Sequence, residues 1–100
     1  MKEVKTLEDY KEAVKEGTVL VKVGHDFCGP CKLTEGNIKS IESEYPDVSF
    51  IKVDTNECDE DIINELNVMS VPVVLVYNNG ELVRRENGLR TTDQLKTYLV

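Results

Sequence analysis

Two cysteines separated by two residues, Cys28 and Cys31, form the segment of the chain best suited to chemistry. A thiolate can attack the sulfur of a disulfide, and a second thiol close by can resolve the mixed disulfide that results. Pro30 suits the first turn of a helix, so the pair is expected at a helix start. There the unpaired backbone N–H groups and the helix dipole favour a negative charge. Cys28 is therefore the expected nucleophile and Cys31 the expected resolving thiol.

A C-x-x-C pair also occurs in zinc, iron–sulfur and haem sites, so the spacing alone leaves alternatives open. The chain has three cysteines and no second C-x-x-C. One alternative is a metal site built from His25, Cys28, Cys31 and Cys58. We prefer redox chemistry, because the pair follows a predicted strand, opens a helix and has no second C-x-x-C partner. We expect a solvated His25 and a free Cys58 thiol, because nothing in the sequence brings these residues together with the pair. Regulatory oxidation of Cys58 stays open.

Helices and strands that alternate along the chain must position the pair. Capping boxes at Thr6 and Thr91 predict helix starts, and Pro46 predicts a helix end. The turn Asn78-Asn79-Gly80 tolerates positive φ and predicts a hairpin. The expected helices cover residues 7–16, from the cysteine pair to 45, 59–66 and from 91 onward, and the expected strands cover 18–23, 48–54, 72–77 and 81–86, with an optional short strand near Val4.

This order predicts an α/β fold in a single domain over residues 1–100. Right-handed crossovers place the early strands in a parallel core, and the hairpin adds an antiparallel edge. We expect a central mixed sheet of four to five strands with helices on both faces. In the second helix, Leu33, Ile38, Ile41 and Tyr45 are expected to form the apolar face.

Charge and hydropathy exclude several classes of function. The formal charge is −7, which disfavours binding to nucleic acid or to anionic membranes. The longest apolar run, Val71 to Tyr77, is too short to span a bilayer, and no secretory signal is expected at the N-terminus. We therefore expect a cytoplasmic protein with no nucleic-acid or membrane partner.

Several motifs together resemble the thioredoxin family. The segment Phe27-Cys28-Gly29-Pro30-Cys31-Lys32 is similar to the family's active site, and Val71-Pro72 to its cis-proline site. Asn79-Gly80 and Gly88 match its later glycines, and the order of elements fits across the whole chain. The resemblance implies a thioredoxin fold and a protein-disulfide reductase that serves electron transport and cell redox homeostasis.

The resemblance also implies partners and binding residues. A flavin-dependent thioredoxin reductase would recycle a protein that needs no bound cofactor besides its redox-active disulfide, and proteins containing disulfides would be the substrates. We expect a monomer, because nothing in the sequence suggests a larger assembly. Phe27 would pack beside the thiols, and Gly29 and Pro30 would shape the turn. Val71, before a cis peptide bond at Pro72, would present backbone groups to the substrate as an added strand. Gly88 would line the same groove, where a missing side chain lets a second backbone approach.

The chain departs from the family pattern at five positions. Phe27 and Gly24 stand where tryptophans are usual, and Gly36 replaces a helix-kinking proline. Lys22 replaces the buried aspartate six residues before the nucleophile, and the position of that aspartate's lysine partner is assigned to Phe50.

The change at Lys22 removes the aspartate on which the family's usual account of deprotonating the resolving cysteine depends. One hypothesis places Lys22 beneath the cysteine pair, where its positive charge favours thiolate. The other lets its stem cover apolar surface while the ammonium reaches water. His25 or Asp26, in the loop before Cys28, is a further candidate for the proton relay.

Two other functions compete with general disulfide reduction. The chain could be a dedicated electron donor to one partner, including a glutaredoxin-like donor, although it lacks the aromatic residue common at the second position of such sites. It could also be a binding module that uses the fold without the thiol chemistry.

Overall fold

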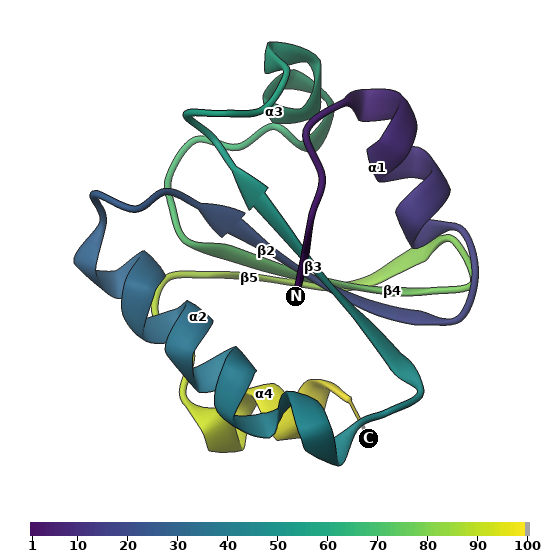
Figure 1. The fold of residues 1–100 in the computed structure, drawn as a ribbon, viewed down its shortest axis with the longest axis vertical. Helices are drawn as coiled ribbons and strands as arrows, with labels where there is room; N and C mark the ends of the chain where they lie inside the picture. The colour runs from purple at the N-terminus through teal and green to yellow at the C-terminus, as the bar shows by residue number, and fades with distance from the viewer. Residues whose placement is uncertain (100) are drawn as a thin grey trace.

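The chain folds into one five-stranded mixed sheet that carries two helices on each face (Figure 1). A computed structural model describes residues 1–99; Val100, the last residue of the predicted domain, lies outside this range. The strands are β1 (Lys2–Glu3), β2 (Thr18–Gly24), β3 (Val48–Asp54), β4 (Val73–Asn78) and β5 (Glu81–Asn87). The helices are α1 (Leu7–Val14), α2 (Gly29–Ile41), α3 (Glu60–Leu66) and α4 (Thr92–Tyr98), and a short 3-10 helix, Glu42–Glu44, extends α2.

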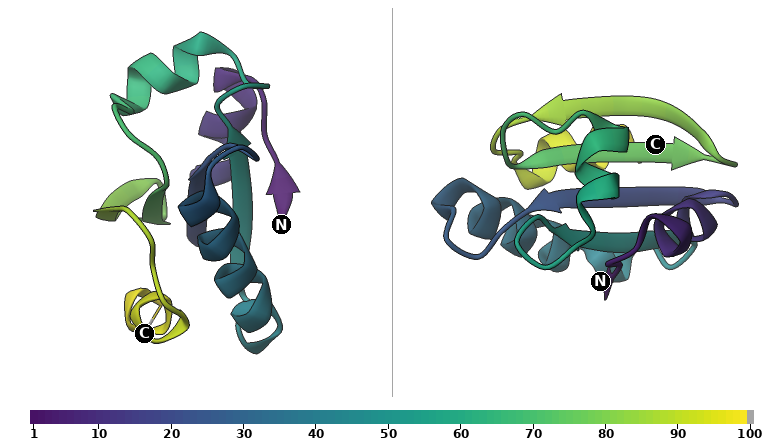
Figure 2. Two further views of the ribbon diagram at one scale, coloured as in Figure 1. Left: turned by 90° about the vertical axis from the view of Figure 1, so that its left-hand side faces the viewer. Right: turned by 90° about the horizontal axis from the view of Figure 1, so that it is seen from above.

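The strands lie in the order β1-β3-β2-β4-β5, which the right-hand view of Figure 2 shows from the side of α1 and α3. β2 pairs in parallel with β3 and antiparallel with β4, and β4 and β5 form the predicted hairpin. The predicted fold class, including the optional first strand, is therefore confirmed. Among residues 1–99, none of the helices has the length and apolar character that a bilayer crossing requires.

Each face of the sheet has its own apolar core. Val19, Val21 and Val23 of β2 point to the side of α1 and α3, while Leu20 points to the side of α2 and α4. This alternation follows from the two-residue period of a strand. β2 is central and buried on both faces, so it needs apolar residues at almost every position. The exception is Lys22, which is 1% exposed.

Local signals explain where the helices start. Oγ1 of Thr6 accepts a hydrogen bond from the backbone N–H of Asp9, and Thr91 and Gln94 form a complete capping box. Cys28 is the N-cap of α2, with Pro30 in the first turn, as predicted.

The predicted apolar face of α2 is wrong at Leu33, which is 60% exposed. The buried residues are Cys31, Thr34, Ile38 and Ile41, and their spacings of three and four residues follow one stripe of the helix. Leu33 falls beside this stripe, and Thr34 takes the buried position. Oγ1 of Thr34 accepts a hydrogen bond from the backbone N–H of Arg90, which satisfies this buried hydroxyl.

Candidate active site

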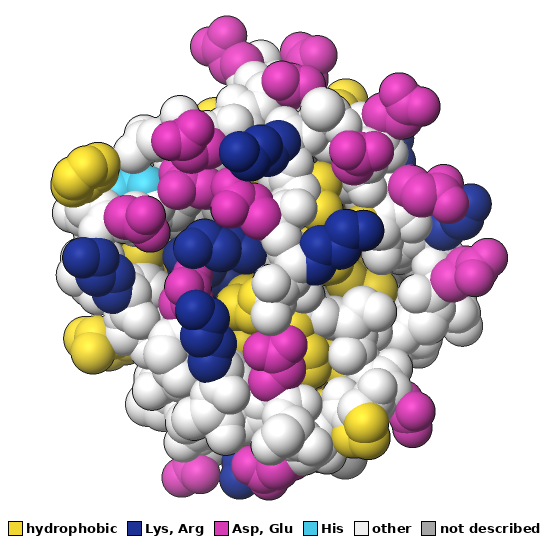
Figure 3. Space-filling view, viewed as in Figure 1, with side chains coloured by type: hydrophobic (Ala, Val, Ile, Leu, Met, Phe, Trp, Pro, Cys, Tyr) yellow, Lys and Arg dark blue, Asp and Glu magenta, His cyan; other side chains and the backbone are white. Residues whose placement is uncertain are grey.

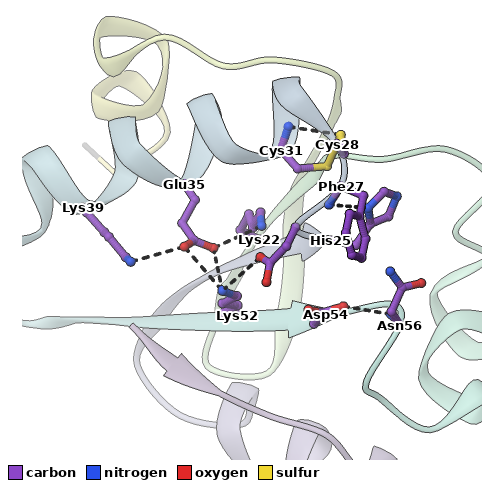
Figure 4. A network of polar contacts seen from close by, with 11 residues as sticks. Lys22, His25, Phe27, Cys28, Cys31, Glu35, Lys39, Lys52, Asp54 and Asn56 are labelled. Carbon is purple, nitrogen blue, oxygen red and sulfur yellow. Dashed lines mark hydrogen bonds and ion pairs between the residues drawn. A yellow bond between two sulfur atoms is a disulfide. The ribbon is translucent and has the colours of Figure 1, made fainter.

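The two cysteines form a disulfide at the first turn of α2 (Figure 4). Their Cα atoms are 5.1 Å apart. Cys28 has an extended backbone, and its Sγ accepts a hydrogen bond of 3.2 Å from the backbone N–H of Cys31. A helix start offers such unpaired N–H groups, and they stabilise negative charge on the sulfur. The pair can therefore alternate between a disulfide and a dithiol at the start of α2.

The two sulfurs differ sharply in exposure. Cys28 is half-buried, whereas Cys31 is 0% exposed. Gly29 and Pro30, between them, are exposed. A disulfide on another protein can therefore approach Cys28 but not Cys31.

Strand pairing brings the other predicted site residues to the same end of the sheet. Val23, near the end of β2, pairs with Val73, the first residue of β4. Pro72 directly precedes Val73 and therefore lies at the same end of the sheet as the cysteine pair. The Val71–Pro72 peptide bond is cis, as expected. The backbone N–H of Gly88 donates a hydrogen bond of 2.8 Å to the carbonyl of Pro72 and fixes the two segments side by side.

Exposed apolar side chains border this end of the sheet. Phe27 is 90% exposed, and its backbone N–H donates to Nδ1 of His25 (Figure 4). His25 thus organises the loop before the cysteines. Met69 is 88% exposed and lines an open hollow of about 240 Å³ together with His25 and Val71. Met69 was missed in the sequence because a single methionine three residues before Pro72 carries no distinctive pattern.

Lys22 does not extend its ammonium to water. Its side chain is 2% exposed, and Nζ lies 3.1 Å from Oε1 of Glu35 on α2 (Figure 4). The interpretation in which Lys22 covers apolar surface and reaches solvent is therefore wrong. The hypothesis that places it beneath the cysteines fits its position, because a Cβ added at Gly24 would lie 2.8 Å from Sγ of Cys31 and 3.1 Å from Cε of Lys22.

The residue beside Lys22 on the next strand is Lys52, not Phe50. Lys22 and Lys52 are register partners, and Nζ of Lys52 lies 3.1 Å from Glu35. Phe50 belongs to the core under α2 and α4. Burial alone would raise the pKa of Glu35, but hydrogen bonds from Lys52 and Lys22 outweigh it and lower the pKa to about 2. Glu35 was missed, although it follows Cys31 by about one helical turn and so shares its side of α2.

The alternative metal site is not assembled. Within residues 1–99, no three His, Cys, Asp or Glu side chains come together as a group that could hold a metal ion. Cys58 is a half-buried free thiol, and burial raises its pKa. Asp26 lies 3.9 Å from Lys52, and its side chain is 68% exposed.

Sequence comparisons match the whole chain to one family. The family model described as Thioredoxin matches residues 2–100. The thioredoxin of Chlamydia trachomatis is 28% identical over 95 residues, covering 95% of this chain and 92% of that protein. The thioredoxin of Mycoplasma genitalium is 33% identical over 88 residues, covering 88% of this chain and 83% of that protein.

Solved structures agree with the sequence comparisons. Plasmodium falciparum thioredoxin superimposes with a TM-score of 0.88 at 27% identity, covering 99% of this chain and 96% of that one. The oxidised form of mitochondrial thioredoxin 3 from Saccharomyces cerevisiae gives a TM-score of 0.87 at 26% identity, covering 97% and 92%. With the disulfide at the start of α2, these matches show that the chain belongs to the thioredoxin family and is a thiol–disulfide oxidoreductase that reduces protein disulfides.

Proposed function

We propose that Cys28 attacks the target disulfide and that Cys31 resolves the mixed disulfide. The observation that carries this assignment is the difference in exposure: Cys28 is half-buried at the helix start, and Cys31 is fully buried. Only the first sulfur can meet a disulfide that is attached to a folded protein. The N–H group that Cys31 donates to Sγ of Cys28 also favours the thiolate there.

The reaction balances within the two sulfurs and the substrate. The Cys28 thiolate bonds to one substrate sulfur, and the substrate disulfide breaks to release one thiolate. The Cys31 thiolate then bonds to Sγ of Cys28, and the bond between Cys28 and the substrate breaks to release the second thiolate. The substrate gains two electrons and takes two protons from solvent, and the Cys28–Cys31 disulfide remains. No bound cofactor enters these steps.

The substrate chain would bind along the end of the sheet that carries the cysteines. Phe27 supports this proposal as an exposed aromatic surface beside the pair. Val71 and Gly88 flank Pro72, and the absence of a side chain at Gly88 lets a second backbone approach. Gly29 and Pro30 shape the exposed turn between the cysteines. We expect Val71 to offer backbone groups to an extended substrate segment, which would bind as an added strand.

We propose that a thioredoxin reductase returns electrons to the pair and that the chain acts as a monomer in the cytoplasm. The matches to proteins named thioredoxin support the reductase, and the free Cys58 thiol suits a reducing compartment. On the face drawn in Figure 3, acidic and basic side chains are interspersed, with acidic groups frequent around α1 and α3. This distribution and the charge of −7 favour neither nucleic acid nor an anionic membrane as a partner.

A coupled assay tests the proposed electron source. NADPH oxidation is followed while the protein reduces insulin, once with a thioredoxin reductase and once with glutathione and glutathione reductase. We expect the thioredoxin reductase to support a rate at least about tenfold higher, because thioredoxin-type pairs are more reducing than glutaredoxins. A faster rate with glutathione would contradict the proposed partner and favour a glutaredoxin-like donor. Activity with neither system would favour a donor dedicated to another partner or a binding module.

A further inference from the structure

A cluster of four charged residues lies below the cysteine pair, and we call it the Glu35 cluster: Lys22, Glu35, Lys39 and Lys52 (Figure 4). The Glu35 carboxylate receives all three ammonium groups, at 3.1 Å from Lys22, 3.1 Å from Lys52 and 3.2 Å from Lys39. Two adjacent strands and one helix therefore converge on a single carboxylate.

The members of the cluster differ in their access to water. The side chain of Lys22 is 2% exposed, that of Glu35 15%, that of Lys52 21% and that of Lys39 59%. Water screens a charge at an exposed position far more than a charge in the interior. The buried part of the cluster thus consists of two positive charges and one negative charge, with Lys22 the most deeply buried of the four.

The stem of Lys22 brings the cluster close to the buried thiol. Sγ of Cys31 and Cε of Lys22 both lie within 3.1 Å of the position that a Cβ on Gly24 would occupy. The absence of a side chain at Gly24 lets the lysine stem and the sulfur share this space. Glu35, about one helical turn after Cys31, holds Nζ of Lys22 and fixes where the ammonium lies.

We propose that Lys22 and Glu35 are positioning residues. Glu35 fixes the Lys22 ammonium, and the buried cluster of Lys22, Lys52 and Glu35 holds a net positive charge beneath Cys31 that keeps this cysteine ready as the thiolate of the resolving step. Lys22 keeps its ion pair with Glu35 throughout, and the Cys31 proton leaves to solvent. The thiolate then attacks Sγ of Cys28, the Cys28–Cys31 bond forms, and the substrate departs as a thiolate. The inference rests on the proposed role of Cys31 as the resolving thiol.

The charged groups around Cys31 come from several elements. Lys22, on β2, lies close to Cys31. Lys52, on β3, and Lys39, on the exposed side of α2, both pair with the Glu35 carboxylate. Asp26, from the loop before the cysteines, lies 3.9 Å from Lys52 but is 68% exposed. An exposed carboxylate is screened by water and offsets little of the buried charge.

Thiol titration of the reduced protein tests this proposal. The 13Cβ shift of Cys31 is followed against pH in the wild type and in Lys22→Met, Lys52→Met and Lys39→Met. We expect Lys22→Met to raise the midpoint by about one pH unit, which is a tenfold loss of thiolate below the midpoint. Lys52→Met should raise it by a smaller amount. Lys39→Met is the matched control, since it removes a charge from the same carboxylate on its solvent side, and it should shift the midpoint least.

Equal midpoints in the wild type and in Lys22→Met, or equal shifts in Lys22→Met and Lys39→Met, would overturn the proposal. If Lys22→Met does not fold, the midpoint shifts of Lys52→Met and Lys39→Met are compared. A larger upward shift in Lys52→Met supports the proposal, and an equal or smaller shift overturns it. A general loss of stability does not predict this order. The titration requires no turnover, so its failure is distinct from a failure of the proposed redox function, which the coupled assay measures separately.

Discussion

Replacement of Cys28 by serine is expected to lower the rate of insulin-disulfide reduction by at least about 1,000-fold, because a serine hydroxyl is not ionised at neutral pH and cannot perform thiol exchange. Cys31 cannot take over the attack, since it is 0% exposed beneath the first turn of α2. The measurement is the rate of insulin precipitation with dithiothreitol as the electron source, after subtraction of the rate without protein.

Cys58→Ser is the matched control for this substitution. It makes the same change of sulfur to oxygen at a half-buried position that packs against the core under α1 and α3. We expect its rate of insulin reduction to equal that of the wild type. A Cys28→Ser protein that retains a substantial rate, or a Cys58→Ser protein that loses it, would place the reactive thiol elsewhere.

Acid is expected to remove a large share of the stability that Glu35 provides. The ion pairs hold the pKa of Glu35 at about 2, below its ordinary value of 4.5. Because the folded pKa is the lower one, the stabilisation is fully present above about pH 4.5 and is lost as the pH falls through 2. A difference of this size corresponds to on the order of 3 kcal/mol at neutral pH. Urea unfolding at several pH values measures it.

Glu35→Gln should lose this stabilisation at neutral pH and show a flatter dependence on pH. The free energy of unfolding of the wild type should therefore approach that of Glu35→Gln between about pH 4.5 and pH 2. Glu44→Gln is the control, because Glu44 pairs with Lys96 at 3.3 Å on the surface, where both side chains are over 40% exposed. Such a pair contributes about 0–1 kcal/mol. A constant gap between wild type and Glu35→Gln across this pH range would contradict the assignment.

Local patterns in the sequence were enough to predict the fold and the reactive pair. Capping residues at Thr6 and Thr91 start helices where expected, and Asn79 and Gly80 form the hairpin turn with positive φ. Each of these signals depends only on neighbours within a few residues. The Cys28–Cys31 pair is local in the same sense, since a spacing of two residues at a helix start fixes its geometry.

The environment of the pair could not be predicted in this way. Lys22, Glu35 and Lys52 come from three separate elements, and the alignment of Lys22 with Lys52 depends on strand register. Phe50, two residues before Lys52, lies on the same face of β3 but pairs with Leu20 instead of Lys22, so it joins the core under α2 and α4. The predicted burial of Leu33 was wrong for a different reason. Its hydrophobicity indicated an inward position, whereas the helical spacing of the buried residues Cys31 and Ile38 places Thr34 on the buried side.

The most direct test of attack by Cys28 is to trap the mixed disulfide with the substrate. Each of Cys28→Ser and Cys31→Ser is mixed with a protein that carries one disulfide, and covalent adducts are identified by intact mass and peptide mapping. Cys31→Ser is expected to accumulate an adduct joined through Cys28, because the attack proceeds and the resolving thiol is missing. Cys28→Ser should form none. An adduct joined through Cys31 or Cys58, or equal trapping by the two variants, would contradict attack by Cys28.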